Sequence, residues 1–207
     1  MGPLESKADR EAVAERIAAI ENETAGEIVV HVVDQSDDYA FWRLLFAAGA
    51  AVVLAEAASF LSPDLAHYGL ELAVGLGLVL WWLLGRPAVL GRVLPRPALA
   101  RAVHRRAQVA FMEDGVYRTR DASGVLIFLS RMEHRVEILA DAGIHARVGT
   151  DGWSRHVNTI VSGIRAGRSA DALHEALTTI GDELKAGFPP RPDDENELAD
   201  HVIVTRR

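Results

Sequence analysis

Three carboxylates stand beside predicted strands, where folding can bring distant residues together. Glu27 begins one predicted strand, Asp121 stands just before a second, and Asp141 directly follows a third. Carboxylate oxygens are the ligands that hard cations prefer, so a gathered set predicts a site for Ca²⁺ or Mg²⁺. A zinc site is not favoured, because the chain has no Cys and no His pair at ligand spacing. The alternative interpretation is three ordinary loop acids that cap turns and helix starts.

The predicted strands decide whether these acids meet. They cover residues 27–33, 124–130 and 135–140, which are rich in β-branched and apolar side chains. A helix joins the first two strands, so they should be parallel with a right-handed crossover. Only four residues separate the second from the third, which predicts an antiparallel hairpin. The three acids therefore converge at one end of the sheet.

Helices with one apolar stripe are predicted around these strands. The helical patterns cover residues 5–23, 99–112, 153–165 and 170–186, and residues 200–205 form a predicted last, edge strand. The order of elements predicts an α/β fold, an α/β/α sandwich with a mixed sheet.

Two long apolar runs interrupt this pattern. Residues 41–61 and 68–84 are separated by only six residues, SPDLAH. About 20 apolar residues in a helix cross the hydrocarbon core of a membrane. The pair therefore predicts a transmembrane hairpin inserted into the α/β domain, with a buried pair of helices in a water-soluble protein as the alternative.

Flanking cations predict the orientation of the hairpin. The short link carries no Lys or Arg. At the other end of the hairpin, Arg43 stands at the entry of the first run, and arginines follow the second run at positions 86, 92, 96, 101, 105 and 106. The positive-inside rule then places the α/β domain in the cytoplasm, anchored to the plasma (inner) membrane by two helices. The sequence thus predicts a discontinuous domain, 1–40 and 98–207, with 85–97 as a juxtamembrane linker.

Composition and motifs narrow the function. The net charge of −7 does not suggest nucleic-acid binding. No P-loop, GxGxxG, GxSxG or HExxH motif occurs, so no nucleophile constellation indicates catalysis. Glu56 and Glu71 stand inside the apolar runs, where they would snorkel or contact a partner helix. The expected partners are the lipid bilayer and other membrane proteins, with a homo-oligomer also considered.

Several segments together resemble the TPM domain family. They are TRDASGVLIFLS at 119–130, RVEILADAGI at 135–144 followed by Trp153, GEIVV at 26–30, and the closing Phe188-Pro189 with ENELAD at 195–200. The last of these is typical of one bacterial branch, and some members carry a membrane pair after the first strand.

The resemblance implies an α/β sandwich with helices on both faces. The family includes thylakoid proteins linked to photosystem II repair, with acid phosphatase activity and divalent-cation binding, and a modulator of an acetylcholine receptor. The acids carried over are Glu27, Asp121 and Asp141. We therefore expect a membrane-anchored TPM-like module for binding, assembly or quality control of membrane complexes. The alternative is a metal-dependent acid phosphatase-like hydrolase, with Arg118 and Arg120 near the phosphate.

Overall fold

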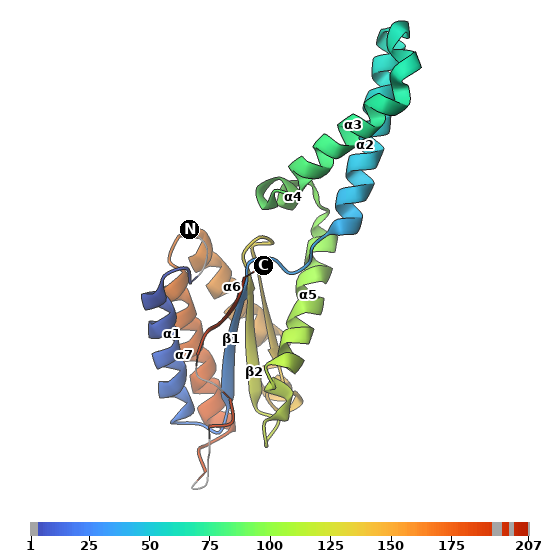
Figure 1. The fold of residues 1–207 in the computed structure, drawn as a ribbon. Helices are drawn as coiled ribbons and strands as arrows, with labels where there is room; N and C mark the ends of the chain where they lie inside the picture. Colours follow the sequence, from blue (N-terminus) through green and yellow to red (C-terminus); the bar gives the residue numbers. More distant parts are fainter. Residues whose placement is uncertain (1–3, 192–195, 199–200, 207) are drawn as a thin grey trace. The chain divides into compact units, whose positions relative to one another are not determined.

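The chain forms two compact units in the computed structural model, which describes residues 4–191, 196–198 and 201–206 (Figure 1). One unit comprises Met1–Ser36 and Ala100–Arg207 and is called the α/β unit. The other comprises Asp37–Leu99 and is called the hairpin unit.

A mixed four-stranded sheet forms the centre of the α/β unit. Its strands are β1 (Glu27–Val33), β2 (Gly124–Ser130), β3 (Arg135–Ala140) and β4 (Ile203–Thr205), in the order β3-β2-β1-β4. β1 is parallel to β2 and to β4, and β2 is antiparallel to β3. The predicted pairing directions of the first three strands are confirmed. The predicted last strand is also an edge strand, although it starts at Ile203, and Asp200 lies outside the described residues.

Helices cover both faces of this sheet, as Figure 1 shows. One face is covered by α1 (Lys7–Glu21), α6 (Ala142–Arg165) and α7 (Ser169–Gly187), and the other by α5 (Arg96–Glu113). The alternation of strand side chains produces the two cores. The three-layer α/β arrangement agrees with the predicted sandwich.

β1 shows how one strand serves both layers. Ile28, Val30 and Val32 join the core beneath α1, α6 and α7. Val29 and Val33 join the core beneath α5. All seven residues of β1 are buried, which explains why its sequence is a continuous apolar run broken only by Glu27 and His31.

The helix starts and breaks follow local side chains. Ser6 caps α1 by accepting a hydrogen bond from the Asp9 backbone N–H at 3.0 Å. α6 begins eleven residues before the predicted helix, and Gly149, with φ of 69°, breaks it near the middle. A left-handed φ is inexpensive only for glycine, so the kink falls at this residue.

The hairpin unit contains α2 (Ala40–Leu61), η1 (Pro63–Tyr68), α3 (Gly69–Leu84) and α4 (Pro87–Val93). α2 and α3 pack along each other, and a Cβ added at Gly77 would lie 3.6 Å from the Cβ of Ala51. The segment expected as a linker, 85–97, is largely helical. α4 starts with Pro87, which suits the first turn of a helix because its missing N–H needs no partner there.

The predicted transmembrane hairpin is not confirmed as a pair of spans. Among the described residues, α2 alone is long and apolar enough to cross a membrane by itself. α3 has 16 residues, ~24 Å of helix, against ~30 Å of hydrocarbon. α3 is long and apolar enough only when it is taken together with α4, and the two helices are bent by 102° relative to each other.

Candidate functional site at the acidic end of the sheet

The strand register brings the three predicted acids to one end of the sheet. Glu27 pairs with Gly124, and the Asp141 backbone N–H donates to the Gly124 carbonyl at 2.9 Å. Asp121 lies three residues before Gly124, and its carbonyl would be 3.4 Å from a Cβ added at Gly143, in the first turn of α6. The three residues therefore lie at the same end of the sheet, as the predicted pairing directions require.

Gly124, the first residue of β2, lies at a close approach of two backbone segments at this end of the sheet. A Cβ at this position would lie 2.3 Å from the carbonyl oxygen of Val116, in the short helix η2 (Val116–Arg118). No side chain fits such an approach, so the start of β2 requires glycine. The neighbouring Ser123 side chain donates to the Ala25 carbonyl at 2.8 Å and ties the approach to β1 to the approach to β2.

Glu27 is the buried member of the set, with 6% of its surface exposed. Its Oε1 accepts a hydrogen bond from the Glu197 backbone N–H at 3.2 Å. Glu197 in turn accepts from the Arg120 backbone N–H at 2.9 Å through Oε2. The segment 196–198 therefore crosses the end of the sheet and contacts both strand approaches.

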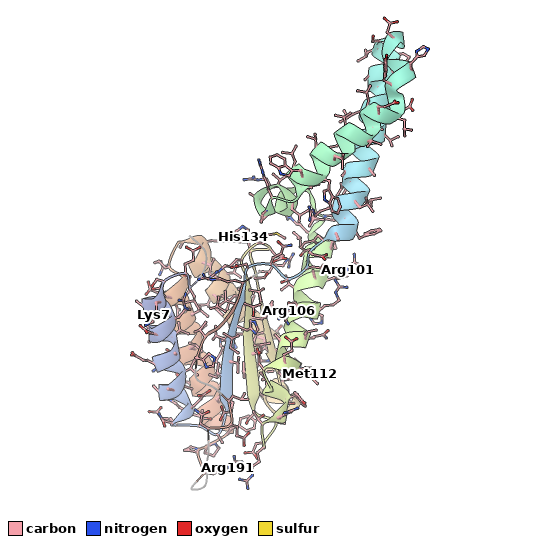
Figure 2. All side chains as sticks on the ribbon, in the orientation of Figure 1. Lys7, Arg101, Arg106, Met112, His134 and Arg191 are labelled. Atoms are coloured by element: carbon pink, nitrogen blue, oxygen red, sulfur yellow. The ribbon has the colours of Figure 1, made fainter. Side chains whose placement is uncertain are left out.

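Asp121 and Asp141 are each held by a different partner. Asp121 forms an ion pair with Arg191, and Figure 2 shows Arg191 at the end of the sheet opposite to His134. Asp141 is the N-cap of α6, and its Oδ1 accepts from the Ala142 backbone N–H at 2.7 Å. A carboxylate at a helix N-terminus is stabilised by the unpaired N–H groups there.

The arrangement places the acids at one end without joining them into one cluster. Within the described part of the chain, no group of three or more His, Asp or Glu side chains is placed to hold a metal ion. Asp193, Asp194 and Glu195 lie outside the described residues. The predicted cation site of Glu27, Asp121 and Asp141 thus stays a prediction, and each acid already has a structural contact.

Arg191 and Glu197 are the site residues that the sequence analysis missed. Both come from the C-terminal segment, 70 residues or more away in sequence from the groups they contact. The available signal was a lone arginine between two prolines, followed by a run of acids. Arg118, suggested for phosphate binding, instead donates from Nε to the Tyr117 hydroxyl at 2.8 Å.

A second polar cluster, also missed, lies inside the layer beneath α5. His31, which is 2% exposed, contacts Asp114 Oδ2 through Nδ1 at 2.7 Å and Thr205 Oγ1 through Nε2 at 2.9 Å. The single His in a β-branched strand was the signal for it. These contacts fasten β4 and the residue after α5 to the central strand, because a buried polar group needs a hydrogen-bond partner.

Comparison with known proteins finds a similarity to one family. Residues 93–183 match the family model described as the TPM domain, which confirms the resemblance predicted from the sequence. The matched segment contains α5, β2, β3 and α6 and most of α7. It holds Asp121 and Asp141 and excludes Glu27.

A solved structure is similar over nearly the whole length. The NMR structure of the BA42 protein from the psychrophilic bacterium Bizionia argentinensis has a TM-score of 0.61 and 19% identity to this chain. The alignment covers 98% of each chain. At this identity the likeness concerns the fold. No curated protein matches the chain.

Proposed function

We propose that the chain is a membrane-anchored TPM-like module that serves the binding, assembly or quality control of membrane complexes. The observation that carries the anchor is the exposed apolar surface of the hairpin unit. Phe60 is 89% exposed, Leu61 83% and Leu70 75%. Exposed apolar surface on this scale, on the 22-residue α2 and on α3, favours a lipid or protein environment over water.

Arginine and tryptophan side chains at one end of the hairpin support the same proposal. The Arg43 guanidinium lies 4.3 Å from the centre of the Trp81 ring and donates to the Trp81 carbonyl at 3.3 Å. Arg86 lies 4.1 Å from the centre of the Trp82 ring. Such pairs suit the boundary between lipid and water, where aromatic rings and cations are enriched. The link at the other end has no Lys or Arg.

The charge asymmetry supports a cytoplasmic α/β unit, with the link on the outer side of the plasma membrane. In this proposal α3 spans with the help of its flanks, since a short helix is accommodated by local thinning or by snorkelling side chains. Glu56 and Glu71 are both exposed on the hairpin. They are the polar groups that a neighbouring membrane helix would contact.

The anchor is tested by single-cysteine labelling, which is clean because the chain has no Cys. Ser62→Cys places a thiol in the link and Glu11→Cys places one on α1. With a membrane-impermeant maleimide on spheroplasts, we expect labelling at position 62 only, and labelling of both after permeabilisation. Recovery of the chain in the supernatant after carbonate extraction would reject the anchor. Labelling of position 11 alone would reverse the orientation.

The finer proposal is that the acidic end of the sheet binds a divalent cation. Its support is the convergence of Glu27, Asp121 and Asp141 at one end. A cation bound only by the folded state at 100 times its Kd adds ~2.7 kcal/mol to stability. We expect Ca²⁺, Mg²⁺ or Mn²⁺ to raise the unfolding midpoint, and Asp141→Asn to remove the shift. Glu15→Gln, on the exposed face of α1, is the matched control. No shift with any of these ions would reject the cation site and leave the anchored module intact.

A further inference from the structure

The outer edge of β3 is not paired with any strand of the described residues. β3 is the first strand in the sheet order β3-β2-β1-β4. Hydrogen-bonded and non-hydrogen-bonded pairs alternate along an antiparallel ladder. Since Asp141 is bonded to Gly124, the backbone groups of Val136, Ile138 and Ala140 face away from β2.

A groove accompanies this edge. It has a volume of about 550 Å³ and is lined by residues 136–140 of β3 and by α6 residues that include His145, Trp153 and Val157. The side chains of Val136, Ile138 and Ala140 belong to the core on the α6 side. The groove and the outward backbone groups therefore lie beside each other, which is the combination that strand addition requires.

Trp153 supplies an independent sign that the groove holds a ligand. Its side chain lines the groove and the residue is 7% exposed. The buried indole Nε1–H has no hydrogen-bond acceptor among the described residues. A buried donor without an acceptor is destabilising, and a carbonyl of a bound peptide would satisfy it.

We propose that the outer edge of β3 binds an extended segment of a partner protein as an added antiparallel strand. The fold disfavours a second copy of the chain paired through the same edge. α6 packs against β3, so each copy would bring its own α6 to neighbouring strands. Paired strands are about 4.8 Å apart, whereas packed helices need about 8–10 Å. A segment without a covering helix meets no such obstacle.

The charges on β3 define the chemistry of this segment. Arg135 and Glu137 alternate with Val136, Ile138 and Ala140 along β3 and lie on the other face of the strand. The Glu137 carboxylate, about a third exposed, contacts His104 at 2.7 Å. An added strand should therefore place a basic residue opposite Glu137 and an acidic residue opposite Arg135, because opposite charges stabilise cross-strand pairs. Apolar residues should face Val136, Ile138 and Ala140.

The probe is the capped hexapeptide acetyl-Val-Thr-Ile-Lys-Val-Glu-amide, in which the two Val and the Ile face Val136, Ile138 and Ala140. Titrated into the full chain in detergent micelles, it should bind with a Kd below about 1 mM. It should also slow amide hydrogen exchange at Val136, Ile138 and Ala140. Exchanging its Lys and Glu should weaken binding, because like charges then face each other across the strands.

Backbone methylation of the peptide tests strand addition while leaving the protein unchanged. Methyl groups on the third and fifth peptide nitrogens remove bonds to β3 and should lower affinity about tenfold or more. Methyl groups on the second and fourth nitrogens, which face away from β3, are the matched control and should retain binding. Equal loss in both peptides, or no binding of the parent peptide, would overturn the proposal.

Two protein variants complete the test. Trp153→Phe keeps the apolar ring, removes the N–H and should weaken binding by about tenfold or less. Ile138→Pro removes the central outward N–H at an edge, where proline is tolerated, and should abolish binding. A concentration-dependent dimer that Ile138→Pro converts to a monomer would assign the edge to a second copy and overturn the peptide proposal. The inference rests on the α/β unit alone, so loss of peptide binding and loss of membrane anchoring are separate outcomes.

Discussion

The α/β unit and helix α2 of the hairpin unit bury side chains of different size. In the α/β unit large side chains such as Phe128, Ile127 and Leu177 are fully enclosed. In the hairpin unit the buried residues of α2 are Ala47, Ala51 and Ala55, while Phe60 and Leu61 are exposed. Exclusion of water accounts for the first arrangement. Small residues between closely packed helices are instead typical of helices in lipid, where burial of apolar area provides no driving force.

The largest expected difference between the units is the loss of stability when one phenylalanine in each is truncated to alanine. Phe128→Ala removes a fully buried ring and should destabilise the α/β unit by about 3–5 kcal/mol. Phe60→Ala removes an exposed ring and should change the stability of the hairpin unit by less than about 0.5 kcal/mol. Chemical unfolding in detergent, followed by circular dichroism, measures both. Equal losses would mean that the hairpin is a conventional water-excluding core and would end the comparison.

The second prediction concerns the close approach of α2 and α3. Gly77→Leu forces a side chain against Ala51 and should destabilise the helix pair by about 1–3 kcal/mol. Gly75→Leu is the matched control, because a Cβ there meets nothing within 4 Å. In a Trp153→Phe background the remaining three tryptophans all lie in the hairpin unit, so their fluorescence during heating reports on it. Similar midpoints for the two glycine variants would contradict a small-residue interface.

Within the α/β unit, removing a buried hydroxyl should cost more stability than removing a surface one, and this difference is smaller than the two before it. Thr205→Val removes the hydroxyl that contacts His31 and should cost about 1 kcal/mol. Thr179→Val, whose hydroxyl bonds a carbonyl of its own helix on the exposed surface, should cost less than about 0.5 kcal/mol. Urea unfolding measures the difference. Equal costs would show that the contact with His31 does not hold β4 in place.

The features predicted correctly from the sequence are those that depend on local pattern and connection length. The seven buried residues of β1 and the seven of β2 are mostly apolar, so both strands stand out in the sequence. The four-residue connection to β3 and the helical crossover were enough to predict the pairing directions. The convergence of Glu27 with Asp141 follows from those directions, which is why it could be predicted without a structure.

The features that were missed depend on long-range partners or on single residues. The contacts of Arg191 with Asp121 and of Glu197 with Glu27 join segments that no periodicity connects. The early start of α6 was hidden by the glycine break at Gly149. α4 was missed because its glycine and the arginines and prolines around it are also typical of a linker. Apolar length alone could not predict that α3 ends after 16 residues in a bend.

The smallest predicted change in stability comes from removing the exposed ion pair between Glu23 and Lys185, which joins the end of α1 to α7. The hydrogen bond from Lys185, together with its charge, holds the pKa of the Glu23 carboxyl below its usual value. A carboxyl with a lowered pKa in the folded state stabilises the fold above its unfolded pKa, and this contribution is lost as pH falls through the folded pKa.

Glu23→Gln should therefore lower the unfolding midpoint slightly at neutral pH, and the difference from the parent chain should vanish in acid. Added salt should reduce it too, because exposed charges are screened. In a double-mutant cycle with Lys185→Met, the two changes should be non-additive at neutral pH and additive in acid. A difference that is independent of pH would mean that Glu23 acts by packing, as the side chains of the hairpin unit do, and that charge has no part in joining α1 to α7.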